Sequence, residues 1–459
     1  MATRQAVEID LELVQRLIAE EERALAEKQP RSIAYQEGAR HRLPGGVSSS
    51  WQTAPPHPIY VSHGKGSRVW DIDGNEFVDY HNGYGVMAVG HANPKVVEAV
   101  QRRIELGSHF AQPTADALVV ADNLAERTGL PLWRFGNSGT EATLDAVRLM
   151  RAATGRDLLL KIEGTYHGHH DALMVSVFPR ADEWGDRERP ASVAQTPGLP
   201  QSYVDLTLVV PFGDVEAARR AFVGHPGEIA GMFVEPCMTN VGLVLPPEGY
   251  LQAIKDLCHE HGAYLAFDEV KTGCTLSWGG AIGSFGVSPD IAAFAKAIGG
   301  GLPCGAIGGV PELMSLVERG KVDQVGTFNG NPLTMAASRA ALTEVLVPDA
   351  YGRFDKLNRI FHQGIEKVIE SYRLPAHLET LGAKGAITWR TEPLHDYRDG
   401  FGVDEGPGYL SWLWQLNRGV FKSPWAKWES WTTSVVHDDG DARRYVDNFE
   451  ALAAAITAG

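Results

Sequence analysis

The first part of the chain combines a helical repeat of apolar residues with a strand–turn–strand pattern. Apolar residues recur at helical spacing from Ile9 to Gln29, in a segment that ends near Pro30, which predicts an arm or packing helix. Residues Gly66 to Asp79 alternate between apolar and polar positions around an Asp-Gly pair, which predicts a β-hairpin.

The middle of the chain, from about Val97 to Val310, alternates helical stretches with short apolar runs. This alternation favours an α/β fold with a mostly parallel sheet covered by helices. Beyond about Thr334 a long helical stretch leads to an α+β segment. We therefore predict a large domain over residues 97–335 and a small α+β domain from both chain ends, residues 1–96 and 336–459. The expected strands are Leu158–Ile162, Thr207–Val210, Ile229–Val234, Ala263–Phe267, Ile291–Ala295 and Ala306–Val310.

Composition narrows the functional classes. The formal net charge of −15 argues against nucleic-acid or anionic-membrane partners, because either would need a basic face. No run approaches the ~20 apolar residues of a membrane helix, and the N-terminus lacks a secretory-signal pattern. The cysteines form no CxxC pair, so we expect reduced core thiols in a cytoplasmic protein; they are Cys237, Cys258, Cys274 and Cys304.

Two strand ends carry an acid and a lysine. Apolar runs lead directly to Asp268 and Lys296, and glycines follow the lysine. Ligands of α/β sheets bind at the carboxyl ends of strands, so both side chains are expected at one site. Pyridoxal 5′-phosphate (PLP) chemistry uses such a pair, a lysine that forms an imine and a carboxylate that keeps the pyridine nitrogen protonated. Taken singly, each residue is more simply explained as a turn residue or a solvated lysine.

Two further segments carry candidate chemistry. NSGTEA, residues 137–142, precedes a helical pattern, and small polar residues at a helix start can bind an anion. The alternative is a plain helix start in which Ser138 and Glu141 form a capping box. EGTYHGHHD, residues 163–171, holds three histidines, but no second ligand cluster accompanies them and we expect no metal site. Stacking on a cofactor ring is the better role for Tyr166 or His167.

Six segments occur in the order and spacing of class-III, fold-type I PLP enzymes. They are NSGTEA, EGTYHGHHD, VEPCMTNVG, FDEVKTG, FAKAIGGGLPCGAIGG and GTFNGNPLTMAA. The chain resembles this family from RLPGGV near Arg42 to the final helix, and within it the glutamate-1-semialdehyde 2,1-aminomutases and their relatives. The resemblance implies a fold-type I large domain, PLP as cofactor and a homodimer with shared active sites.

The resemblance also implies a role for each matching residue. Lys296 would carry PLP as a Schiff base and move the substrate proton, while Asp268 would pair with the pyridine nitrogen. Tyr166 would stack on the ring, with Val270 behind it. Thr327 of the neighbouring subunit would complete the phosphate cup. The remaining implied cofactor contacts are Ser138, Gly139 and Thr140 at the phosphate, His167 beside the ring, and Glu235 and Asn240 on the floor.

One departure from the aminomutase pattern bears on the substrate. Where those enzymes usually continue NSPVRAF, with an arginine that holds the substrate carboxylate, this chain has Gln52. A neutral amide cannot supply the bidentate, charge-assisted pair of an arginine. The candidate carboxylate holders elsewhere are Arg390, Arg398 and Arg418, and spacing does not choose among them. Glu429 is a further candidate for contact with the substrate.

Tryptophans gather near the C-terminus, at Trp412, Trp414, Trp425, Trp428 and Trp431. Tryptophan packs small domains well, so a structural role is the simpler explanation. The alternative is an aromatic pocket, completed by Trp51, for a bulky or aryl-bearing amine.

We therefore predict a ping-pong aminotransferase that moves an amino group from a small-molecule amine or amino-acid donor to a keto acid. The alternative is glutamate-1-semialdehyde 2,1-aminomutase, an internal amine shift. A lyase or racemase on the same scaffold stays open. The Asp268–Lys296 pair and the lack of a GxGxxG fingerprint argue against a nucleotide-binding module without catalysis.

Overall fold

The structure is a computed structural model that describes residues 6–423 and 428–458. A seven-stranded sheet forms the larger domain, in the order β4-β12-β11-β10-β9-β5-β8. The strands run parallel except β12, which pairs antiparallel with β11 and β4. The predicted α/β fold class is therefore confirmed. The strands are β4 (Leu132–Gly136), β5 (Leu158–Ile162), β8 (Thr207–Val210), β9 (Ile229–Val234), β10 (Tyr264–Asp268), β11 (Ile291–Ala295) and β12 (Gly305–Gly309).

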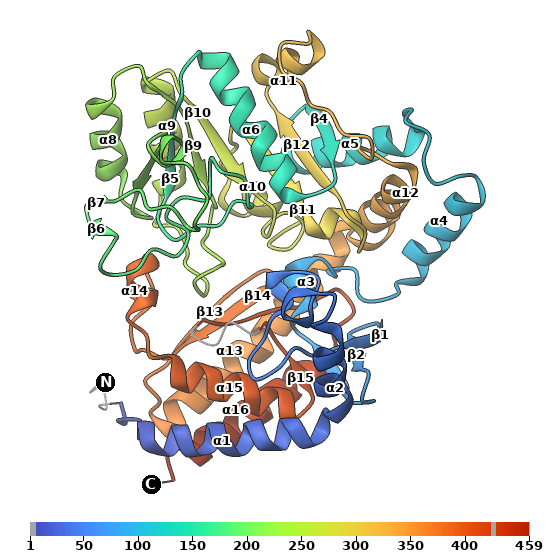
Figure 1. The fold of residues 1–459 in the computed structure, drawn as a ribbon, viewed down its shortest axis with the longest axis vertical. Coiled ribbons are helices and arrows are strands. Elements are labelled where there is room, and N and C mark those ends of the chain that lie inside the picture. The colour runs from blue at the N-terminus through green and yellow to red at the C-terminus, as the bar shows by residue number, and fades with distance from the viewer. Residues whose placement is uncertain (1–5, 424–427, 459) are drawn as a thin grey trace.

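The central strands β9, β11 and β12 are buried along their whole length, which explains their continuous apolar sequences. Helices cover the sheet, as Figure 1 shows, and α6 packs across β9, β11 and β12. The helices of this part of the chain, from just before β4 to just after β12, are α4 (Pro94–Glu105), α5 (Ala115–Thr128), α6 (Gly139–Thr154), α7 (Gln201–Val204), α8 (Val215–Gly224), α9 (Tyr250–Glu260), α10 (Gly280–Phe285), η3 (Lys296–Gly299), α11 (Pro311–Glu318), α12 (Pro332–Ala340) and η4 (Ala341–Val345). A short hairpin, β6 (Gly185–Asp186) and β7 (Arg189–Pro190), lies in the loop after β5.

The smaller domain draws on both chain ends. In its four-stranded sheet, β15 (Val420–Phe421) pairs in parallel with β3 (Glu76–Asp79), next to β2 (Arg68–Asp71) and β1 (Val61–Lys65). A second sheet contains β13 (His377–Leu381), β14 (Lys384–Thr388) and β16 (Glu429–Thr432). The other elements are α1 (Leu11–Lys28), α2 (Pro30–Ala39), η1 (Pro44–Gly46), η2 (Ser50–Gln52), α3 (Asn82–Gly85), η5 (Pro348–Tyr351), α13 (Gly352–Tyr372), α14 (Tyr397–Phe401), α15 (Glu405–Asn417) and α16 (Asp439–Ile456).

The predicted N-terminal helix is α1, and it begins where Asp10 caps it. The Asp10 carboxylate accepts hydrogen bonds from the backbone N–H groups of Glu12 and Leu13. The apolar face of α1 packs on α15 at the lower edge of the molecule in Figure 1. The predicted hairpin is formed by β2 and β3.

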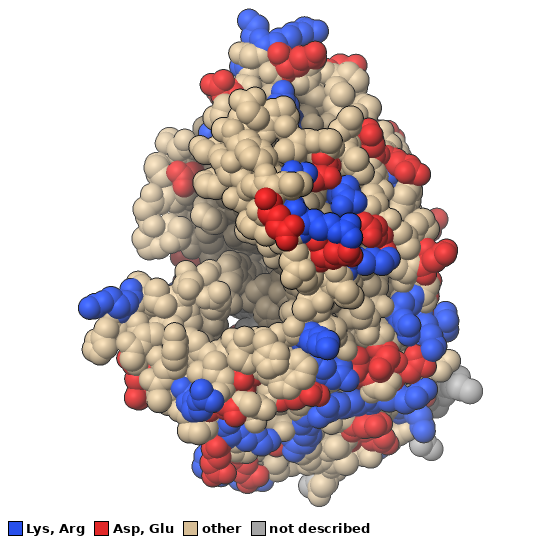
Figure 2. All heavy atoms as spheres, turned by 90° about the vertical axis from the view of Figure 1, so that its right-hand side faces the viewer, with Lys and Arg blue, Asp and Glu red and all other residues tan. Residues whose placement is uncertain are grey.

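The molecule is hollowed where the two domains meet, and uncharged residues edge the hollow in Figure 2. The domain limits at residues 96 and 335 stay a prediction. Within the described chain, no helix is long and apolar enough to cross a membrane.

Candidate active site

A cavity of about 500 Å³ lies at the carboxyl ends of β10 and β11. The start of α6, the loop after β5 and the η2 turn also line it. It therefore brings together most of the predicted site residues, which come from segments far apart in the sequence. Those that line the cavity are Trp51, Ser138, Gly139, Thr140, Tyr166, His167, Glu235, Asn240, Asp268, Val270 and Lys296.

Lys296 follows β11 directly and opens the η3 turn. Its φ of +52° is a conformation that a lysine rarely adopts, and such strained residues cluster at functional sites. Burial lowers the pKa of the Lys296 amine to about 8, helped by the nearby charge of Lys271. A fraction of the amine is therefore neutral near pH 7.5, as a nucleophile or base requires.

Asp268 ends β10 and is held on both carboxylate oxygens. Oδ1 accepts from the backbone N–H of Val270 at 2.9 Å, and Oδ2 lies 2.8 Å from Nδ1 of His167. Burial lowers the pKa of His167, so the ring is neutral and donates through Nδ1–H to the carboxylate. His167 therefore fixes the orientation of Asp268.

The start of α6 provides donors for an anion. Ser138 is the N-cap and accepts from the N–H of Glu141 at 3.2 Å, while the Glu141 carboxylate accepts from the N–H of Asn137. Only half of the expected capping box is formed, because the Glu141 side chain accepts from the N–H of Asn137 and not from that of the N-cap Ser138. Gly139 faces Val270, and a Cβ on the glycine would lie 3.0 Å from the valine methyl groups.

The floor of the cavity carries buried polar groups. Glu235, just after β9, accepts a hydrogen bond from Thr239 through Oε1, and its Oε2 has no hydrogen-bond partner among the described residues. Burial raises the pKa of Glu235 to about 7. Asn240 accepts through Oδ1 from Nζ of Lys271 at 2.5 Å.

Aromatic side chains also line the cavity. The Trp51 ring meets Tyr166 edge-on at 5.4 Å between centroids and Tyr84 at 5.7 Å. Trp428 stacks with Phe178 at 6.1 Å and donates from Nε1 to the carbonyl of Gly400. These rings all line the cavity.

Two predicted residues, Gln52 and Thr327, do not line the cavity, and two further predicted side chains lie outside the described residues. The Gln52 amide is exposed, accepts from the N–H of Ser48 at 3.0 Å and does not line the cavity. Thr327 is exposed, and its carbonyl accepts from His109 at 2.7 Å. The Glu429 side chain and all of Trp425 lie outside the described parts of the structure.

The tryptophan cluster divides between the cavity and the core. Trp428 lines the cavity, whereas Trp412 and Trp431 are fully buried in the smaller domain. Trp414 lies 3.4 Å below the guanidinium of Arg418. The structural explanation therefore holds for three of these residues.

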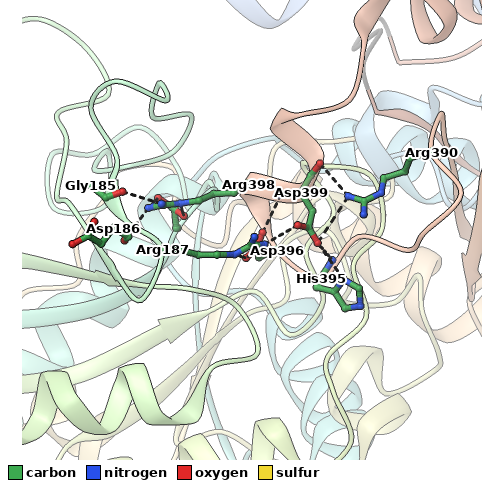
Figure 3. A network of polar contacts seen from close by, with 9 residues as sticks. Gly185, Asp186, Arg187, Arg390, His395, Asp396, Arg398 and Asp399 are labelled. Carbon is green, nitrogen blue, oxygen red and sulfur yellow. Dashed lines mark hydrogen bonds and ion pairs between the residues drawn. The ribbon is translucent and has the colours of Figure 1, made fainter.

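The three candidate arginines, Arg398 among them, all make contacts away from the cavity lining. The Arg398 guanidinium pairs with both carboxylate oxygens of Glu163, at 2.8 and 3.0 Å. It also donates to the carbonyls of the 184–186 segment (Figure 3). Arg390 contacts Asp399, as Figure 3 also shows, and Arg418 pairs with Glu21. No arginine lines the cavity among the described residues.

Two lysines at the site were missed. Lys271 lines the cavity, and Lys384 lines a smaller pocket beside it. The sequence did carry a signal for each of them. Lys271 lies three positions after Asp268 in FDEVKTG, and Lys384 is the one charged residue in the short strand sequence KGAIT. The cysteines are all buried and unpaired, as expected for core residues, although Cys304 also lines the cavity. No group of three or more potential metal ligands gathers within the described residues.

The comparisons with known proteins decide the family. Residues 49–396 match the family Aminotransferase class-III. The chain belongs to the class-III aminotransferases. It is 35% identical to a glutamate-1-semialdehyde 2,1-aminomutase of Persephonella marina, over 90% of this chain and 96% of that protein. Further curated relatives of the same name are 34–36% identical.

Solved structures of transaminases share this fold. The chain superposes on an omega-transaminase from Sphaerobacter thermophilus with a TM-score of 0.89 and 32% identity, covering 95% of this chain and 100% of that one. It superposes on a β-phenylalanine aminotransferase from Variovorax paradoxus with a TM-score of 0.84 and 27% identity, covering 95% and 97%. This class-III chain is thus a fold-type I, PLP-dependent enzyme.

The residues present fit PLP. The buried Lys296 amine and the oriented Asp268 carboxylate stand at neighbouring strand ends, and the α6 start offers N–H groups to a phosphate. The unsatisfied Oε2 of Glu235 offers a buried acceptor to a hydroxyl. A Cβ at Gly168, which has a φ of +94°, would lie 2.8 Å from Thr140, so this glycine allows the close approach of the two segments.

Proposed function

We propose that the protein is an aminotransferase that moves the amino group of a bulky or aryl-bearing amine or amino acid to a keto acid. The cavity lining supports this proposal most directly. No arginine stands among its described residues, and its aromatic wall consists of Trp51, Tyr84, Tyr166, Phe178 and Trp428. Aromatic rings favour an aryl group through stacking and apolar contact. Substrates of class-III enzymes are small molecules, and the aromatic wall favours those that carry a bulky or aryl group.

The residues of the chain divide the chemical work. PLP supplies the electron sink that weakens the bond from the substrate α-carbon to its proton. Lys296 would hold the cofactor, and its Nζ, once free, would accept and give back the substrate proton, a task suited to an amine with a pKa of about 8. Asp268 would keep the pyridine nitrogen of the bound cofactor protonated, and His167 holds Asp268 in place.

Glutamate-1-semialdehyde 2,1-aminomutase is the second candidate. The curated relatives carry this name, and sequence similarity supports it more strongly than the aminotransferase. Against it stands the loss of the arginine, because Gln52 is neutral and turned to Ser48. An aminomutase needs no second substrate, so the two candidates differ in a simple experiment.

A homodimer with shared active sites belongs to this proposal. Thr327 lies in an exposed loop whose apolar neighbours, Val325 and Phe328, are 81% and 60% exposed. Exposed apolar residues of this size mark an interaction surface. The neighbouring subunit would cover them, and Thr327 would then reach the phosphate site of the other protomer.

The test is the absorption spectrum of the purified holoenzyme with 1-phenylethylamine, β-phenylalanine or glutamate-1-semialdehyde. An aminotransferase converts the lysine-bound cofactor to pyridoxamine phosphate with an aryl donor, and pyruvate or 2-oxoglutarate reverses the change. Formation of 5-aminolevulinate from glutamate-1-semialdehyde alone, with no response to aryl donors, would establish the aminomutase instead. Lys296→Ala is the control, because it cannot move the proton.

A further inference from the structure

A small side pocket adjoins the cofactor cavity on the side of the smaller domain. It has a volume of about 30 Å³ and is lined by the segment after β3, by β14 and by β16. Tyr84, Thr239, Gly242 and Lys271 line both spaces, so the pocket is an extension of the substrate site.

Two lysines reach this pocket from different domains. Lys271 follows β10 in the larger domain, and Lys384 begins β14 in the smaller domain. Lys384 is only 6% exposed, and its Nζ has one described contact, the Thr432 hydroxyl at 3.5 Å, which is longer than an ordinary hydrogen bond. Lys271 donates to the Thr239 carbonyl at 3.1 Å and to the Asn240 amide, which leaves one of its three donors.

Both lysines are costly to bury without an anion. Burial lowers the pKa of Lys384 to about 7, and the charge of Lys271 lowers it further. Burial also lowers the pKa of Lys271, while the charge of Glu235 opposes that change. Neither lysine forms an ion pair with a described residue. A role in ordering the 239–240 turn accounts for Lys271 but leaves Lys384 unexplained, since buried charges are ordinarily paired.

We propose that Lys271 and Lys384 form a subsite that binds the carboxylate of the amino-acid or keto-acid substrate. This assignment rests on the proposed function, because it requires an acid substrate at the cofactor. The pocket has room for about two water-sized atoms, which matches the two oxygens of a carboxylate. A bound carboxylate favours the protonated form of both lysines, which then supply the positive charge that an arginine would otherwise provide. Aryl and carboxylate groups of one substrate then bind on separate walls.

The experiment compares ligands with and without a carboxylate on the holoenzyme. β-Phenylalanine carries the carboxylate and 1-phenylethylamine lacks it, so the ratio of their apparent dissociation constants isolates the subsite. The non-reacting acid 3-phenylpropionate, titrated by calorimetry, measures carboxylate binding without catalysis. The variants are Lys271→Met, Lys384→Met and Lys384→Gln. Lys161→Met is the matched control, because Lys161 is another buried lysine and donates to the carbonyls of Thr165 and Val175, and none of these three residues lines the cavity.

We expect each subsite variant to bind 3-phenylpropionate and β-phenylalanine roughly 10- to 100-fold more weakly, as for loss of a charge-assisted hydrogen bond. In the two Lys384 variants, affinity for 1-phenylethylamine should change less than about threefold. The control should leave the ratio unchanged. Unchanged acid affinity in Lys384→Met and Lys384→Gln, or equal losses for acid and amine, would overturn the subsite.

Failure of the proposed function gives a different result. If the parent enzyme transfers no amino group from any aryl donor, the aminotransferase proposal fails. Binding of 3-phenylpropionate and its loss in the lysine variants still test the subsite, because that ligand does not react.

Discussion

The buried ion pair of Arg398 and Glu163 allows a test of whether Arg398 stabilises the fold or binds the substrate carboxylate. Replacing Arg398 by methionine keeps much of the side-chain volume and removes the charge. Glu163, 2% exposed on its side chain, then keeps a buried carboxylate without its bidentate partner. Breaking a buried pair in this way costs about 3–5 kcal/mol of unfolding free energy. The guanidinium also lies 4.7 Å over the Trp184 ring, so a cation–π contact is lost as well.

The loss should grow with pH. Burial raises the pKa of Glu163 above its ordinary value even with Arg398 opposing the rise, and removal of Arg398 raises it further. The folded variant then holds a proton that the unfolded chain has released. Its stability falls as pH rises from the unfolded carboxyl pKa to the folded one, by at most about 1.4 kcal/mol per pH unit. Urea denaturation of Arg398→Met and the parent at pH 6 and pH 8.5 measures the difference.

The double variant Glu163→Gln with Arg398→Met is the control. It removes both charges, so most of the lost stability and its pH dependence should return. A single variant within about 1 kcal/mol of the parent at both pH values would refute the reasoning. A large rise in KM for the keto acid with unchanged stability would restore Arg398 as the substrate ligand.

Three further predictions concern the cofactor and the cavity. Asp268→Asn should weaken PLP binding at least roughly tenfold in titration of the apoenzyme, because an amide cannot pair with a charged pyridine nitrogen; unchanged affinity contradicts this. Lys271→Met should raise the pKa of Lys296, since burial and then Lys271 lower it, and move the pH profile of PLP uptake upward; an unchanged profile would count against it. Trp51→Ala and Trp428→Ala should each reduce the kcat/KM preference for aryl over small aliphatic amines roughly tenfold. An unchanged preference would make these rings packing residues only.

The cofactor residues were predictable because the apolar pattern of the strands and their order along the chain are enough to place these residues at one edge of the sheet. Parallel strands end at one edge, so the apolar runs that lead to Asp268 and Lys296 are enough to imply that the two side chains lie close together. Four of the six expected strands have the predicted bounds, and β10 and β12 are shifted by one residue. These shifts occur at strand ends, where hydrogen bonding and not apolar pattern sets the limit.

The substrate side was harder to predict because its contacts join the two domains. Nothing in the spacing shows that Arg398 meets Glu163, or that Lys384 enters a pocket beside Lys271. The tryptophans show the same limit, since Trp428 lines the cavity while Trp431, three residues later, packs in the core. Both sit on or next to one strand, whose alternating faces separate their roles.

The Glu163–Arg398 pair also connects the smaller domain to the chemistry without touching a substrate. Glu163 begins the loop after β5 that carries Tyr166 and His167 into the cavity. Arg398 lies on α14 and holds the first residue of that loop, and His167 at its far side holds Asp268. Loss of Arg398 therefore leaves the loop free to shift, which should weaken PLP binding through Asp268. The KM for the keto acid should stay unchanged, because Arg398 does not line the cavity.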